Sequence, residues 1–139
     1  MTADPSPHEA LIYLMVVMSA ADRDMTDAEL GRIGNMIRTL PVFREFDQNR
    51  IIEVATQCQQ ILQKDDGMER ILTLVRETVP RSLHDTAYAV AVEVAAADLH
   101  VEPEERRMLQ IVRNRLHLEP LVAAAIERAA EARHRRLVS

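Results

Sequence analysis

The stretch AADRDMTDAE, residues 20–29, joins two hydrophobic segments, and AADLHVEPEE, residues 96–105, repeats its pattern 76 positions later. Each copy holds an alanine pair, an aspartate, an apolar residue three positions further on, and a glutamate seven positions after the aspartate. The flanking segments align without gaps, so that Ile12 matches Tyr88 and Ile33 matches Leu109. We therefore predict a duplicated helix–turn–helix unit, with repeat units at about 8–40 and 84–116 and a pseudo-twofold relation between them.

The composition favours an all-α fold. Hydrophobic residues make up 47% of the 139 positions, but aromatic residues only 3%, and the chain contains three glycines and no Trp. An aliphatic core with so little glycine is typical of packed helices rather than of a sheet with many tight turns. We expect a compact single-domain bundle of about seven helices over residues 8–139, preceded by a flexible leader at 1–7.

Two sequence patterns predict where helices start. Thr26 with Glu29 forms a capping box, in which each side chain bonds the backbone N–H of the other residue. Asp66 with Glu69 suggests a second cap of the same kind.

Two helical segments are less well defined by their patterns. The segment around Ala87–Val92 alternates in a way that also fits a strand, but its alanines and its length favour a helix through about Ala97. In the last helix, which follows Pro120, four residues are expected to face the core: Val122, Ala125, Ile126 and Ala129.

Charge and cysteine content narrow the classes of function. The net charge of −5 argues against general affinity for nucleic-acid phosphates. Cys58 is the only cysteine, which fits a reducing cytoplasm, and its helical stripe with Ile51, Ala55 and Leu62 predicts a buried structural thiol. The apolar run Leu11–Met18 is too short to span a membrane.

The two acidic turns are the candidate metal site. The spacing of aspartate, apolar residue and glutamate resembles the second half of a calcium-binding loop, but Met18, Ala20, Val94 and Ala96 occupy the first ligand positions and offer no side-chain oxygen. If the two turns meet, they combine into one divalent-cation site for Ca²⁺, Mg²⁺ or Zn²⁺, with ligands Asp22, Asp24, Glu29, Asp98, His100 and Glu105. The alternative is that the acidic residues only end one helix and cap the next.

The sequence contains no recognisable pattern of catalytic residues. The histidines lack His-x-x-x-His or Cys–His spacing, so a dedicated zinc site is not expected. Glu93 interrupts the apolar helix before the second turn, and we expect it at an edge or paired with an arginine. The alternative for Glu93 is the acid of a functional pocket.

These acidic turns resemble those of the tellurite-resistance TerB family and of the related N-terminal helical domain of DjlA-type co-chaperones. Their usual turn is Ala-Asp-Gly, followed by an apolar residue and Glu. Here the turn reads Ala21-Asp22-Arg23-Asp24-Met25 with Glu29, and again Ala97-Asp98-Leu99-His100-Val101 with Glu105. The likeness covers about residues 8–136, although Arg23 and Leu99 replace the glycine.

The resemblance implies a compact all-α fold in the bacterial cytoplasmic stress response, with metal-linked and membrane-associated roles and no established enzyme activity. We expect a non-catalytic stress-response module that acts through protein partners and binds divalent cations weakly at its paired acidic turns. The alternative is a metal-free helical adaptor or scaffold. Homo-oligomerisation, peripheral membrane association and a role in tellurite resistance itself are left open by the sequence.

Overall fold

The structure is a computed structural model that describes residues 5–20, 25–97 and 103–137. These ranges form seven α-helices and three 3₁₀ helices and contain no strand, which confirms the all-α prediction. The α-helices are α1 Pro7–Ala20, α2 Asp27–Thr39, α3 Ile51–Leu62, α4 Gly67–Thr78, α5 His84–Ala97, α6 Pro103–Arg115 and α7 Pro120–Arg133. The 3₁₀ helices are η1 Pro41–Phe43, η2 Gln48–Arg50 and η3 Arg81–Leu83.

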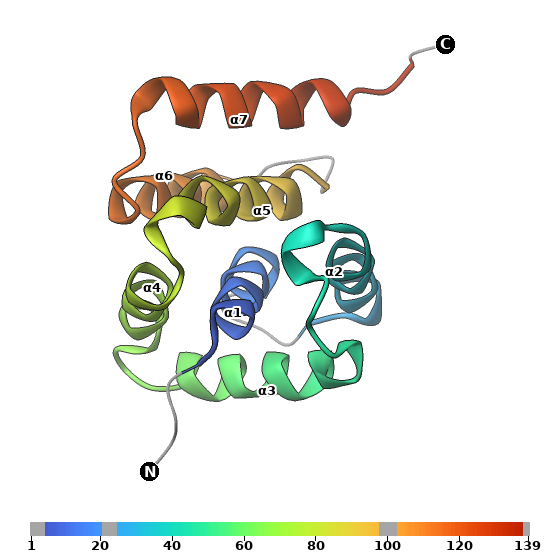
Figure 1. Cartoon of the computed structure of the whole chain (residues 1–139), viewed down its shortest axis with the longest axis vertical. Coiled ribbons are helices and arrows are strands. Elements are labelled where there is room, and N and C mark those ends of the chain that lie inside the picture. The colour runs from blue at the N-terminus through green and yellow to red at the C-terminus, as the bar shows by residue number, and fades with distance from the viewer. Residues whose placement is uncertain (1–4, 21–24, 98–102, 138–139) are drawn as a thin grey trace.

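Helix α1 is the centre of the molecule (Figure 1). Every residue from Ala10 to Met18 is buried, because α3, α4 and α5 pack against it from different sides. A helix that is apolar all round requires such an environment. In the described ranges, every helix falls short of the length and apolar character needed to cross a membrane.

Helix α1 begins with a capping box that was not predicted from the sequence. The Ser6 hydroxyl accepts a hydrogen bond from the Glu9 backbone N–H at 3.2 Å, and Glu9 Oε1 accepts one from the Ser6 N–H at 2.8 Å. Pro7 occupies the first helical position, where its missing N–H carries no penalty. The helix therefore begins one residue before the predicted start of the domain at His8.

The two predicted caps have different outcomes. Thr26 and Glu29 form the expected capping box at the start of α2. Asp66 precedes α4 but makes no side-chain cap hydrogen bond, so that prediction is wrong. With φ −104° and ψ 20°, Asp66 lacks the extended backbone that aims an N-cap side chain at the helix.

Gly67, the first residue of α4, lies directly on the end of α3. A Cβ atom built at this position would meet the Ile61 carbonyl oxygen and would lie 2.7 Å from Leu62 Cα. Both are backbone atoms, which cannot rotate away as a flexible side chain would. The tight turn between α3 and α4 therefore depends on the missing side chain of Gly67.

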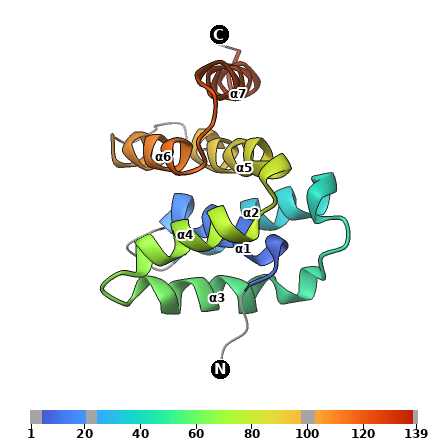
Figure 2. The ribbon, with the colours of Figure 1, turned by 60° about the vertical axis from the view of Figure 1, so that its left-hand side comes forward.

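Helices α5, α6 and α7 form the layers on one side of α1, and α3 lies on the opposite side. Figure 2 shows α5 and α6 side by side, with α7 outside them. The region that also suggested a strand is helical, as predicted, and lies within α5. Helix α7 packs on α5.

The predicted inner face of α7 is largely wrong. Ala123 and Ala130 are the buried residues of the helix, and Ile126 is half-buried, as predicted. Val122, Ala125 and Ala129 are exposed instead.

The pair α1–α2 and the pair α5–α6 have matching lengths, 14 and 13 residues in each case. Their packing differs, because α5 and α6 lie in close contact whereas α1 and α2 approach each other at few positions. The pseudo-twofold repeat therefore stays a prediction from the sequence.

Candidate functional site

The structure describes two of the six predicted metal ligands, Glu29 in the first turn of α2 and Glu105 in the first turn of α6. The four others lie outside the described residues: Asp22, Asp24, Asp98 and His100.

Glu29 is a buried carboxylate, with 7% of its surface exposed. Its Oε1 accepts the Thr26 backbone N–H at 2.9 Å, and its Oε2 accepts the Ser19 hydroxyl at 3.2 Å. The Thr26 hydroxyl in turn accepts the Glu29 N–H at 3.1 Å. Because Ser19 belongs to the last turn of α1, Glu29 fastens the end of one helix to the start of the next. This confirms the helix-capping role expected for Glu29.

Glu29 and Glu105 line the same small pocket, although 76 positions separate them in the sequence. The pocket has a volume of about 20 Å³, which is room for a single water or ion. Its walls come from α1, α2, α5 and α6, and its lining residues are Met18, Ser19, Glu29, Arg32, Ile33, Met36, Val94 and Glu105.

The pocket offers a cation only part of a coordination shell. Two carboxylates and the Ser19 hydroxyl are oxygen donors, whereas Ca²⁺ takes about six to eight oxygens and Mg²⁺ about six, several of them from water. Arg32, on the same wall, adds a positive charge that opposes a cation. Within the described ranges, no three His, Cys, Asp or Glu side chains are grouped as a metal site. A cation here would need further ligands from water or from the adjoining chain segments.

Glu93 pairs with residues at the end of α7, and its pairing with an arginine agrees with the prediction from the sequence. Its Oε2 bonds Arg133, and its Oε1 lies 2.7 Å from His134 Nε2. A carboxylate can only accept, so this nitrogen of His134 carries the proton. Burial by itself raises the pKa of Glu93, but the hydrogen bonds from Arg133 and His134 outweigh it and hold the pKa below its ordinary value.

The lowered pKa of Glu93 gives a stability difference with a definite sign. The folded state favours the ionised carboxylate, so the interaction of Glu93 with Arg133 and His134 stabilises the protein at pH values above the ordinary glutamate pKa. This stabilisation is lost as the pH falls through the pKa of Glu93 in the folded state. We expect Glu93→Gln to lower the free energy of unfolding by about 1 kcal/mol at neutral pH, with the gap to wild type closing in acid. Urea unfolding across this pH range measures the gap, and a gap independent of pH would contradict the assignment.

Cys58 has no exposed surface, as predicted. Burial raises the pKa of its thiol to about 12, and its Sγ donates a weak bond to the Tyr13 carbonyl oxygen at 3.6 Å. A thiol that stays protonated is a poor nucleophile, so Cys58 behaves as an apolar core residue.

Two open grooves flank α5, and neither was foreseen from the sequence. The first, of about 610 Å³, is lined by α5, α6 and α7. Beside its apolar wall, the Tyr88 hydroxyl donates to Glu127 Oε2 at 2.8 Å, and Arg113 lies 3.5 Å from the same oxygen. The second, of about 540 Å³, runs between the end of α2 and α5, with Glu93 and Arg133 among its lining residues.

Comparison with known proteins gives one family match. The family model described as tellurite resistance protein TerB matches residues 8–128, which covers α1 from its second residue, all of α2 to α6 and most of α7. Neither the curated proteins nor the solved structures yield a match.

Proposed function

The chain belongs to the TerB family, and we propose that it is a non-catalytic stress-response module that acts through protein contacts. Membership of this family suggests a domain related to tellurite resistance. We further propose that the paired acidic turns bind a divalent cation weakly, and that the module works in the cytoplasm.

The observation that carries the cation proposal is the shared pocket of Glu29 and Glu105. Each glutamate follows one of the two acidic turns in the sequence, so a pocket common to both supports a single combined site rather than two separate ones. Since both belong to first helical turns, the positive ends of two helices point toward this region. The positive helix ends and Arg32 both weaken cation binding, which is why the proposed affinity is low.

Cation binding should raise the melting temperature by mass action. For a cation at about ten times its dissociation constant, the free energy of unfolding rises by about 1.4 kcal/mol, which corresponds to roughly 4 °C for a domain of this size. We expect Asp22→Asn combined with Asp98→Asn to abolish the increase. Calorimetric titration with Ca²⁺, Mg²⁺ and Zn²⁺, run beside thermal melts, measures both effects.

The matched control is Asp65→Asn combined with Asp66→Asn, which removes two like charges at the turn between α3 and α4. This variant should keep the full response. Glu29→Gln retains an oxygen that can accept the Thr26 N–H, so it should remain folded yet respond less to the cation. Equal responses in all variants, or none in the wild type, would contradict the proposal.

A metal-free adaptor is the second candidate. It is favoured by the hydrogen bonds that already engage both oxygens of Glu29, since such a carboxylate has a complete structural role without a cation. An adaptor would show no thermal response to any of the three cations, while still binding a protein partner.

A further inference from the structure

Helix α7 is the outermost helix of the molecule and packs on it with one side (Figures 1 and 2). Ala123 and Ala130 are buried on the side toward α5. The opposite side carries further apolar residues that the described chain leaves exposed: Leu121, Val122, Ala124, Ala125, Ala129 and Ala132.

This outer face is unusual for a surface helix. Leu121 is 84% exposed and Val122 is 37% exposed, and the alanines continue the apolar surface toward the other end of the helix. Arg128 interrupts the face and pairs along the helix with Glu131 at 3.7 Å. A helix with apolar residues on both sides is usually covered on both sides.

We infer that the outer face of α7 binds the same face of a second copy of this chain, with the two helices antiparallel. The apolar face is asymmetric along its length, with its large residues near the N-terminal end and only alanines near the C-terminal end. In an antiparallel pair, Leu121 and Val122 of each copy lie against Ala129 and Ala132 of the other. Large residues then meet small ones in both halves of the contact, as close packing requires.

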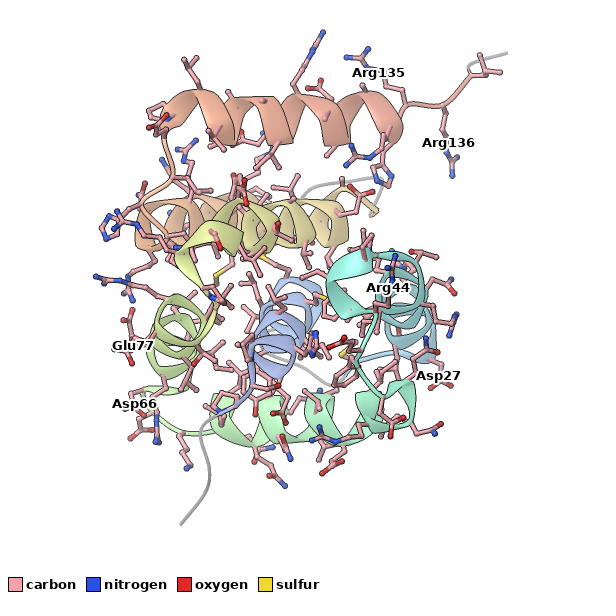
Figure 3. The ribbon with its side chains drawn as sticks, in the orientation of Figure 1. Asp27, Arg44, Asp66, Glu77, Arg135 and Arg136 are labelled. Carbon is pink, nitrogen blue, oxygen red and sulfur yellow. The ribbon has the colours of Figure 1, made fainter. Side chains whose placement is uncertain are left out.

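The charges at the ends of α7 select the same orientation. Glu119 is exposed at the N-terminal end, and Arg135 and Arg136 lie at the C-terminal end, as Figure 3 shows. An antiparallel pair places Glu119 of each copy near the arginines of the other and sets opposite helix-dipole ends side by side. A parallel pair would instead bring the two arginine-rich ends together.

The small size of the face favours a weak contact. Helix α7 has 14 residues, so it is about 21 Å long, and one face of it is smaller than a standard protein interface. The dimer is therefore weak, with a dissociation constant on the order of 100 µM, and forms and separates with concentration.

The test is sedimentation velocity of the full chain from about tenfold below to about tenfold above that constant. Wild type should shift from monomer to dimer, whereas Leu121→Asp should raise the dissociation constant at least about tenfold. Because residue 121 lies in the first turn of α7, an aspartate there suits the helix dipole and leaves the monomer folded. The matched control, Ile52→Asp, changes a residue of α3 that is 66% exposed and should dimerise like wild type.

Charge reversal tests the antiparallel orientation. Glu119→Arg alone and Arg135→Glu alone should each weaken the dimer, and the two changes together should restore it. A wild-type chain that stays monomeric throughout, or a Leu121→Asp variant that dimerises as well as wild type, overturns the inference. Binding of the monomer to anionic lipid vesicles through Leu121 would likewise overturn it, by assigning the face to a membrane.

Discussion

Replacing Leu14 with alanine is expected to lower the free energy of unfolding by about 4 kcal/mol. Leu14 lies in the middle of α1 and has no exposed surface, and α1 is enclosed by α3, α4 and α5. The lost methyl groups forfeit their transfer free energy, and the surrounding helices cannot close the cavity completely. For a domain of this length the melting temperature should fall by roughly 12 °C.

Urea unfolding followed by far-ultraviolet circular dichroism measures the effect of Leu14→Ala. Ile52→Ala is the control, because Ile52 is an aliphatic helix residue at the surface, and it should change the stability by less than about 0.5 kcal/mol. A Leu14→Ala variant as stable as this control would mean that α1 is not the centre of the core.

The second large effect is expected at Gly67. Gly67→Ala should lower the free energy of unfolding by about 3 kcal/mol, because the added methyl group meets the backbone of Ile61 and Leu62. Relief of the clash requires α4 to move away from the end of α3, which disturbs the packing of both helices on α1. Thermal melts and urea unfolding measure the loss.

Gly31→Ala is the matched control and should have the opposite sign. Gly31 lies inside α2, and a Cβ built there meets nothing within 4 Å. Alanine is a better helix former than glycine and should raise the free energy of unfolding by about 0.7 kcal/mol. If Gly67→Ala left the stability unchanged or raised it as Gly31→Ala should, the close approach at Gly67 would be contradicted.

Sequence patterns predicted the helix ends well where the stabilising contacts join residues that are close in the sequence. The capping box of Thr26 and Glu29 is confirmed because its bonds connect neighbouring residues and need no tertiary information. The same pattern is present at Ser6 and Glu9. It was not predicted, because residues 1–7 were expected to form a flexible leader. Aspartate is a common N-cap residue, but Asp66 does not have the backbone conformation of an N-cap. The residue type alone does not determine φ and ψ.

The orientation of α7 and the two grooves could not be read from the sequence. A helix rich in alanine has weak periodicity, so several faces qualify as the inner one. Which face is chosen depends on the surface that α5 presents to α7, and that surface is a property of the tertiary structure. That Glu29 and Glu105 line one pocket is also a consequence of the tertiary structure. The sequence marked both residues as equivalent, but their shared pocket depends on how α2 and α6 are placed.

The chain has no Trp, and its two tyrosines lie in different layers, one in α1 and one in α5. Tyr13 donates to Gln57 Oε1 of α3 at 3.3 Å, whereas Tyr88 donates to Glu127 of α7. Each ring is thus an intrinsic fluorophore that reports on a different contact, and the carboxylate beside Tyr88 should quench its emission while α7 stays docked. With Tyr13→Phe and Tyr88→Phe as single-probe variants, ultraviolet emission can follow release of α7 separately from loosening of the α1–α3 contact.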